Sequence, residues 1–280
     1  MIEDFASAIP VEVTGTLLSV PYADRAPLRG WSLAILGALK PKLTARQKAL
    51  GNRSVMEFMA YLKIHILEWR KHPRNPEHDV LTRLIGDEAY GAKLSESELL
   101  QNCVVILNAG HETTTNLIGN ALVALTEYPQ VKSELLLKQE LIAQYIPGLE
   151  AYLNPVINEF LRFGSSNQLS NRRALRDTQL GGVAVAACSL LTLRIGAANR
   201  DPAQFDQPNQ LLLMEREDNR HLAFVLGIHQ CAGMSQARLE GRIAIGRFLQ
   251  RFPACRLAQP PNVGGRACFS RFLQKPFGTA

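Results

Sequence analysis

Residues Phe224–Gly233, with the sequence FVLGIHQCAG, decide how the rest of the chain is interpreted. Cys231 is a lone cysteine in a loop that contains Gly227 and ends at Gly233, and a helical pattern begins directly after it. Glycine lets the backbone come close to a large flat ligand. The first N–H groups of a helix and its dipole stabilise a thiolate at this position. The stretch therefore predicts a thiolate ligand at the start of a helix.

The composition is that of a globular protein. The chain has 280 residues, 46% of them hydrophobic and 20% charged, which is enough to bury a large core. The formal net charge of +6 comes without a block of Lys and Arg and without interleaved aromatic residues, so no nucleic-acid partner is expected. A solvated surface with excess arginine explains the charge, and a partner with an acidic face is the alternative.

The cysteines argue against a disulfide framework. Their number is odd, their spacing is wide and no CxxC pair occurs, which favours a reducing compartment over a disulfide scaffold or a zinc knuckle. They are Cys103, Cys188, Cys231, Cys255 and Cys268. The start of the chain, Met1–Asp4, is acidic where a secretory signal would be basic, and no apolar run approaches 18 residues. We therefore expect a cytoplasmic protein without a membrane anchor.

Helical patterns dominate the first 165 residues. Short helices broken by prolines are expected over residues 1–50, and apolar residues at helical spacing predict an amphipathic helix over 54–71. The longest helix is expected over about 95–128, where Ser95 and Glu98 form a capping box.

The spacing of the apolar residues changes from a helical to a strand-like pattern in the second part of the chain. Residues 166–280 predict a small β region, with a turn into a strand at Leu180–Val185, followed by the cysteine loop, a helix over about 233–252 and short terminal strands. The fold class is therefore mainly α with small β-sheets (α+β). We expect residues 1–280 to form a single domain.

The stretch Ala109–Thr115, AGHETTT, has unusual chemistry for the middle of a helix. A glycine there costs about 1 kcal/mol relative to alanine, and threonines compete for backbone carbonyls. Either the helix is locally distorted for function, or small residues make a notch where another element crosses. A zinc HExxH motif is excluded, because the second histidine is replaced by Thr115.

Glu159 and Arg162 stand three residues apart on one helical face, so an ion pair between them is natural. If it is exposed, such a pair is worth little. If it is buried, it must act as a structural clamp with further hydrogen bonds.

Four stretches in this order make the chain resemble a cytochrome P450 of the soluble bacterial kind. They are AGHETT at 109–114, EFLR at 159–162, GAANRDP at 196–202, and NRHLAF from 219 continuing to CAG at 231–233. Each alone is weak, but together they are specific, and the resemblance covers essentially the whole chain. It implies the P450-like fold, here lacking the family's N-terminal helices and first strands.

The resemblance also implies a cofactor, haem b, and a role for each matching residue. Cys231 matches the thiolate ligand of the haem iron and Phe224 the aromatic residue beside its sulfur. Gly233 belongs to the same haem-binding loop. His229 and Arg172 match residues that pair with the haem propionates, with Arg173 as the alternative to Arg172.

The distal motif and the clamp match the family in the same way. Ala109 and Gly110 match the helix surface over the haem, and Glu112 and Thr113 match an acid–alcohol pair that relays protons to oxygen. The pair Glu159 and Arg162 matches the ExxR clamp of the core.

The implied function is a haem-thiolate monooxygenase that inserts one atom of O2 into a small hydrophobic organic substrate. Two electrons would come from a ferredoxin-type donor, for which Arg238 and Arg242 are candidate docking residues, ordinary solvation of a helix being the alternative. A non-catalytic, truncated P450 remnant with weak or no haem binding is the other main hypothesis. A haem-dependent sensor is a third.

Two local departures from the family pattern bear on these hypotheses. Val225 stands where the family usually has glycine, so we expect a shifted or strained loop beside the iron. Gln210 and Leu211 stand where the family has an arginine followed by an aromatic residue. A buried Glu159 would therefore lose one charged partner.

Overall fold

The computed structural model describes residues 1–39, 43–77, 79–86, 94–137, 150–213, 216, 219–258 and 277–278. The chain divides into two compact units: an N-terminal unit, Glu3–Thr115, and a C-terminal unit, Met1–Ile2 with Asn116–Ala280. The longest helix, α5 (Glu96–Glu127), runs from one unit into the other. That residues 1–280 act as a single domain stays a prediction.

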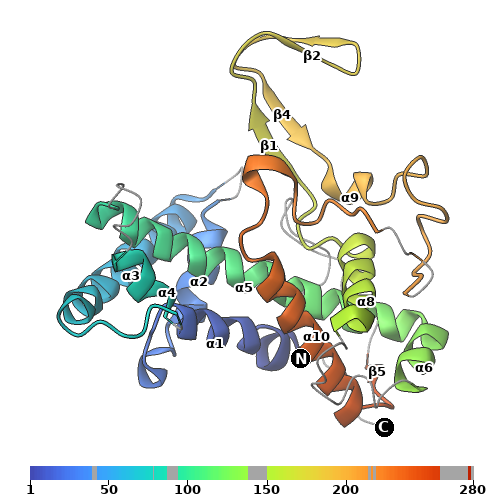
Figure 1. Ribbon diagram of the computed structural model, residues 1–280, viewed down its shortest axis with the longest axis horizontal. Helices are drawn as coiled ribbons and strands as arrows, with labels where there is room; N and C mark the ends of the chain where they lie inside the picture. The colour runs from blue at the N-terminus through green and yellow to red at the C-terminus, as the bar shows by residue number, and fades with distance from the viewer. Residues whose placement is uncertain are drawn as a thin grey trace. The chain divides into compact units, whose positions relative to one another are not determined.

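The N-terminal unit is helical. Its elements are η1 (Ile2–Ala6), α1 (Ala8–Leu17), η2 (Tyr22–Asp24), α2 (Leu28–Gly37), α3 (Ala45–Lys71), α4 (Val80–Gly86) and the first part of α5 (Figure 1). The expected amphipathic helix is confirmed as α3, whose stripe Phe58, Leu62, Ile66 and Trp69 is buried. It begins earlier than predicted, because Thr44 and Gln47 form a capping box.

Helix α5 has almost the predicted bounds. The backbone N–H of Ser95 donates to Glu98 Oε2 (2.8 Å) and that of Glu98 donates to Ser95 Oγ (3.3 Å), so the predicted capping box is present. The helix remains α-helical through Ala109–Thr115.

The C-terminal unit adds α6 (Pro129–Leu137), α8 (Glu150–Phe163), α9 (Ile195–Ala198), η3 (Gly227–His229) and α10 (Met234–Arg251). Helices α5, α8 and α10 meet at Gly241, where a Cβ atom would lie 3.0 Å from Leu117 and 3.7 Å from Ile157. This close packing places α8 and α10, the helix that follows the cysteine loop, on one core. The helix predicted over 233–252 is confirmed as α10, with Gly233 at its N-cap.

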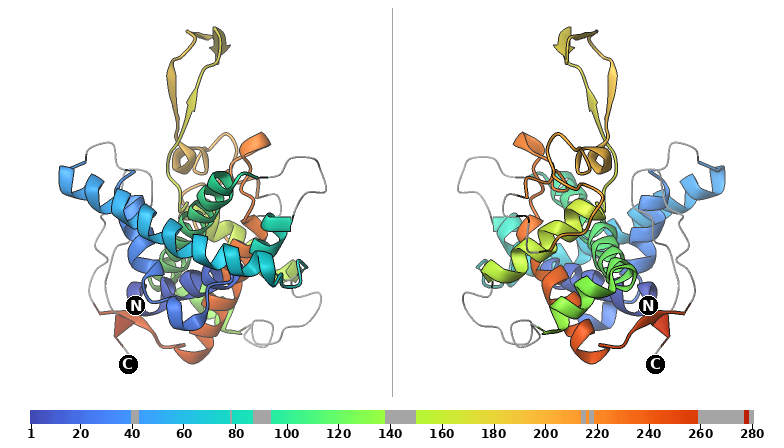
Figure 2. Two further views of the ribbon diagram at one scale, coloured as in Figure 1. Left: turned by 90° about the vertical axis from the view of Figure 1, so that its left-hand side faces the viewer. Right: turned by 90° about the vertical axis from the view of Figure 1, so that its right-hand side faces the viewer.

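Three two-stranded antiparallel sheets complete the C-terminal unit. Strand β1 (Ser170–Arg173) pairs with β4 (Leu190–Leu193), β2 (Thr178–Leu180) with β3 (Val183–Val185), and β5 (Arg256–Leu257) with β6 (Phe277–Gly278). The predicted turn is a tight hairpin with positive φ at Gly181 (53°) and Gly182 (83°). The β2–β3 hairpin prolongs the β1–β4 ribbon away from α9 (Figures 1 and 2).

Candidate functional site

The clamp predicted from Glu159 and Arg162 is buried and complete on the arginine side. Arg162 Nε and Nη2 each donate to the Glu159 carboxylate over 2.7 Å, in a bidentate fork between side chains with no exposed surface. The remaining N–H donors reach three backbone carbonyls: Nη1 donates to Asn199 O (2.9 Å) and Pro208 O (2.8 Å), and Nη2 to Gln210 O (2.9 Å). All five donors of the guanidinium are thus used.

The expected loss of a charged partner for Glu159 is wrong. Arg216 Nε donates to Glu159 Oε2 over 3.1 Å, from a side chain with only 9% exposure. Asn219 Nδ2 donates to the same oxygen (3.0 Å), and the backbone N–H of Leu212 donates to Oε1 (3.1 Å). Gln210 takes part through its backbone carbonyl, which any residue offers, and Arg216 supplies the second cation at Glu159.

The clamp also fixes the start of the cysteine loop. The hydrogen bond from Asn219 to Glu159 holds this part of the chain against α8. Asn199, fully buried, accepts from the backbone N–H of Leu222 (2.7 Å) and donates from Nδ2 to Ser165 Oγ (2.6 Å). Sequence reasoning assigned no role to Asn199, Arg216 or Asn219, because their partners lie tens of residues away and no periodicity reports them.

Within the loop, the backbone folds Cys231 back onto Phe224. The N–H of Cys231 donates to Phe224 O over 3.0 Å, and that of Gln230 donates to Gly227 O over 2.9 Å. Cys231 is a free, exposed cysteine just before the N-cap of α10, and His229 is exposed in η3. The thiol therefore lies just before the start of a helix, as the sequence predicted.

Arg238 braces the loop from α10. Its guanidinium lies over the Phe224 ring (4.9 Å to the centroid), and Nε donates to Asn158 Oδ1 (2.9 Å). Burial lowers the pKa of Arg238, and the nearby Cys231 opposes this effect. A half-buried, bonded arginine is neither a freely solvated residue nor an open docking residue. Arg242, which is also half-buried, stays a candidate for a docking role.

His221 joins the same cluster in its neutral form. The backbone N–H of Ala223 donates to Nδ1 (3.2 Å), which leaves Nε2–H to donate to Asn158 Oδ1 (3.3 Å). Burial, aided by the positive charges of Arg238 and Arg162, lowers the pKa of His221 to about 4. Asn158 and Glu159, neighbours on α8, thus hold two different parts of the loop.

Val225 adopts the strained backbone that its sequence position suggested. Its φ is +57°, in the left-handed region, where a β-branched residue is an outlier. Its N–H closes a turn on Leu222 O (2.9 Å). The loop thus forms with valine at a conformation that favours glycine, at a cost of about 1–2 kcal/mol.

Replacing Val225 with glycine is expected to raise the free energy of unfolding by about 1 kcal/mol. Relief of strain exceeds the extra entropy that glycine gives the unfolded chain. Urea unfolding followed by circular dichroism measures the change. V225A, which keeps the Cβ atom, should gain less than half as much, and a V225G protein less stable than the parent would contradict the prediction.

The distal stretch belongs to the N-terminal unit. Thr113 Oγ1 donates to Ala109 O over 2.6 Å, and Glu112 and Thr113 are half-buried. A Cβ on Gly110 would lie 2.9 Å from Thr14 Oγ1, so glycine is required where α5 passes α1. Between the two explanations of the sequence, an unbroken helix and this contact favour the packing notch for Gly110.

Arg172 lies on β1, half-buried. Its Nη1 donates to Ser170 Oγ (2.9 Å) and to Asn171 O (2.8 Å). Within the described part of the chain, no hydrogen bond or ion pair joins Arg172 to His229, so their shared role toward one ligand stays a prediction.

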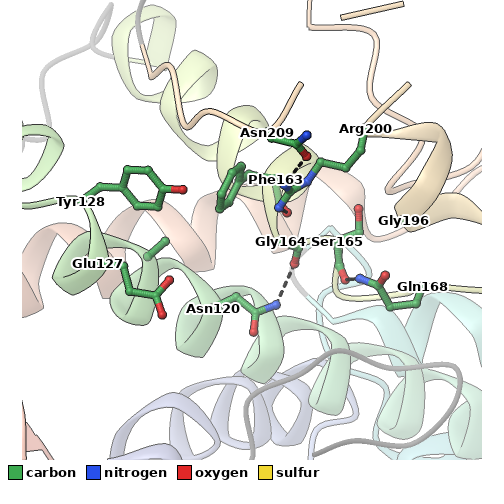
Figure 3. Close-up of a pocket in the computed structure, with 11 residues that line it drawn as sticks. Asn120, Glu127, Tyr128, Phe163, Gly164, Ser165, Gln168, Gly196, Arg200 and Asn209 are labelled. Carbon is green, nitrogen blue, oxygen red and sulfur yellow. Dashed lines mark hydrogen bonds between the residues drawn. The ribbon is translucent and has the colours of Figure 1, made fainter. Parts of the chain in front are cut away.

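A polar pocket of about 460 Å³ opens elsewhere in the C-terminal unit (Figure 3). In it, Asn120 donates to Gly164 O (2.7 Å), and Arg200 donates from Nη1 to Asn209 Oδ1 (3.1 Å) while lying over the Phe163 ring. None of the residues predicted for catalysis or cofactor binding lines it. The pocket is therefore separate from the cysteine loop.

The comparisons with known proteins agree with the order of the motifs. The family model for cytochrome P450 matches residues 35–264. The chain belongs to the cytochrome P450 family. The resemblance inferred from the four stretches, and the mainly helical fold with small sheets, are thereby confirmed.

The relatives are bacterial P450s. The chain is 33% identical over 94% of its length to the polyketide biosynthesis cytochrome P450 PksS of Bacillus subtilis and 35% identical over 92% to the biotin biosynthesis cytochrome P450 of the same organism. These matches span 60% and 61% of the two relatives. A crystal structure of P450BioI in complex with an acyl carrier protein ligated to hexadec-9Z-enoic acid matches with a TM-score of 0.88 and 31% identity, over all of this chain and 68% of that one.

Members of the family bind haem through a cysteine thiolate, and the loop has the donor set for it. Cys231 is exposed at a helix N-terminus, and two apolar side chains on its loop, Leu226 (65%) and Ile228 (97%), are open to solvent. A Cβ added at Gly227 or Gly233 would meet nothing within 4 Å. An accessible thiol, bare apolar side chains and an open backbone fit a large apolar ligand with an iron centre.

Proposed function

We propose that the chain is the haem-binding part of a P450 monooxygenase that oxidises a small hydrophobic organic substrate. The observation that supports this most is the accessible Cys231 on a loop held at both ends, by Glu159 and Asn199 at its start and by α10 at its end. A rigid loop sets a thiolate in one position, as an iron ligand requires. The chain spans about 60% of the length of its curated relatives. The activity of the whole protein is therefore part of what we propose.

Each residue has a task in the proposed site. Cys231 ligates the iron, Phe224 shields the sulfur, and Gly233 lets the backbone approach. His229 and Arg172 would donate N–H groups to the haem propionates, with Arg173 as the alternative to Arg172. Bound haem supplies the chemistry of oxygen activation, and the protein supplies position and protons.

Glu112 and Thr113 are proposed to relay protons toward the oxygen site. The Thr113 hydroxyl gives its hydrogen to Ala109 O, which leaves the lone pairs of Oγ1 to accept a hydrogen bond from a donor beside the helix. Glu112, the adjacent half-buried residue, is the acid that replaces a proton once it has been passed on. Ala109 and Gly110 keep the neighbouring helix surface small.

The carbon monoxide difference spectrum of the reduced, haem-supplied protein tests the proposal. A Soret band near that of thiolate-ligated haem is expected for the parent chain, and C231A should lose it entirely, since no thiolate then reaches the iron. C188A removes another exposed cysteine and should keep the band.

A soluble chain without any haem absorption would reject the proposal and favour the non-catalytic remnant. A band that persists in C231A would reject Cys231 as the ligand.

The partner is proposed to be a ferredoxin-type electron donor, which suits a chain of net charge +6 because such donors are acidic. Arg242 on α10, near the loop in sequence, is the candidate docking residue. R242E should weaken reduction by a ferredoxin several-fold, more strongly at low ionic strength, as stopped-flow absorption can measure. Equal rates for R242E and the parent at low salt would exclude this contact.

Cytoplasmic location stays a prediction. Among the described helices, none is long and apolar enough to cross a bilayer.

A further inference from the structure

We propose that His111 is a positioning residue that sets the rotation of α5 and so the directions of Glu112 and Thr113. The proposal rests on the proposed function and deepens it. The motif AGHETT places His111 between the two small residues Ala109 and Gly110 and the acid–alcohol pair. Its ring, with 1% exposure, joins three elements of the N-terminal unit.

The ring is held at both nitrogens. Nε2 lies 2.8 Å from the hydroxyl of Ser7, the residue before α1, and Nδ1 lies 2.9 Å from the hydroxyl of Ser32 on α2. Both serines are buried, with 3% and 0% exposure. A hydroxyl can donate or accept, so either tautomer of the ring is satisfied without movement of the backbone.

The Ser7 hydroxyl is itself fixed. Arg29 Nε, from α2, donates to Ser7 Oγ over 3.0 Å, and Arg29 Nη2 lies 3.3 Å from Glu3 Oε1. The ring therefore docks on an oxygen that a second helix already holds. On the neighbouring flank of α5, Gly110 lies against Thr14 with no room for a Cβ atom, which limits rotation toward α1.

Helix geometry turns this anchor into a constraint on the acid–alcohol pair. Successive residues are about 100° apart, so Thr113 points about 200° away from His111, on the far side of α5. A rotation of about 20° would move a side-chain tip some 6 Å from the axis by about 2 Å. Misplacement of a catalytic group by about 1 Å can cost about 100-fold in rate. A ring fixed to two helices prevents such a rotation.

A buried histidine could also serve the core alone, and its loss would then lower stability without altering the far face of α5. The test compares three variants. H111F keeps an aromatic ring and removes both hydrogen bonds, whereas H111Q keeps an amide donor and acceptor. L62A is the matched control: it opens a cavity in the same unit but removes neither hydrogen bond of the His111 ring.

The first measurement needs no cofactor. Hydrogen exchange of the amides of residues 108–116, followed by mass spectrometry, should be about tenfold faster in H111F than in L62A at equal overall stability, because loss of the two buried hydrogen bonds makes local opening of α5 easier. H111Q should fall between H111F and the parent. Equal exchange in H111F and L62A would overturn the proposal, even in a chain that never binds haem.

The second measurement uses the haem-loaded, reduced protein and dioxygen alone. After air is admitted, the oxidised spectrum should return about tenfold faster in H111F than in the parent, and within twofold of the parent in L62A. The carbon monoxide band should be unchanged in all variants, since Cys231 is intact. If the parent protein shows no carbon monoxide band, the proposed function is rejected and the positioning role of His111 is not. If the band is intact but the oxidised spectrum returns at the same rate in H111F and L62A, the positioning role is rejected and the proposed function is not.

Discussion

Replacing Arg162 with methionine is expected to lower the free energy of unfolding of the C-terminal unit by about 4 kcal/mol. The guanidinium places all five donors on the Glu159 carboxylate and on three backbone carbonyls. Methionine fills much of the space but leaves those carbonyls without donors and a buried carboxylate with Arg216 as its remaining cation. Breaking one partner of a buried pair costs 3–5 kcal/mol, because the other charge stays desolvated.

The two tryptophans allow the loss to be assigned to one unit. Trp31 and Trp69 both lie in the N-terminal unit, so their fluorescence follows that unit while circular dichroism follows both. In urea, R162M should shift the dichroism transition to lower concentration and leave the fluorescence transition within about 0.5 kcal/mol of the parent.

R200M is the matched control for R162M. Arg200 lies over the Phe163 ring and donates to Phe163 O (2.7 Å), but it is half-exposed, so its loss should cost about 1 kcal/mol. An R162M protein no less stable than R200M would show that the clamp is not a source of stability.

The clamp shows how far sequence reasoning reached and where it stopped. The i,i+3 spacing of Glu159 and Arg162 was sufficient to predict their pairing, since that contact is local. Arg216 was missed because its partner is distant in sequence and the intervening segment has no period to align it. The prediction that Glu159 would lose a charged partner at Gln210 failed because Arg216 supplies that charge. Residue 210 takes part only through its backbone carbonyl, which accepts from Arg162 and which no side-chain pattern reveals.

Helices and turns were predicted where local rules act alone. The capping box at Ser95 and the glycine pair at 181–182 set α5 and the β2–β3 hairpin within one or two residues. Val225 was recognised as a misfit from its residue type, and its positive φ agrees. The anchoring of His111 by Ser7 and Ser32 had no sequence signal, because serines are common and only the packing of α1 and α2 brings those two to one ring. Between the short terminal strands β5 and β6, residues 259–276 lie outside the described residues.

Replacing Glu240 with glutamine is expected to stabilise the protein above neutral pH. Glu240 on α10 has 7% exposure; Gln236 Nε2 donates to its Oε1 (2.8 Å), and its Oε2 has no hydrogen-bond partner among the described residues. Burial raises the pKa of Glu240 to about 7, and the bond from Gln236 only partly opposes it. The folded chain therefore favours the neutral acid, and the unfolded chain ionises first.

The sign of the pH dependence follows from that difference. The contribution of Glu240 to stability is fully present below a pH of about 4.5 and is lost as pH rises from there through about 7, a loss of about 3 kcal/mol at pH 8. Glutamine does not ionise, so E240Q should gain about 2 kcal/mol more over the parent at pH 8 than at pH 5.

Comparing the two pH values removes any constant cost of placing an amide in this site, since that cost is the same at both. Urea unfolding followed by circular dichroism at pH 5 and pH 8 measures both gains. E127Q, which changes an exposed carboxylate of the same unit, should differ from the parent by no more than about 0.5 kcal/mol at either pH. A gain for E240Q that is equal at the two pH values would mean that Glu240 does not titrate in this range. A gain confined to pH 8 would instead show that α10, the helix that begins at the cysteine loop, contains a buried acid that weakens the fold when it ionises.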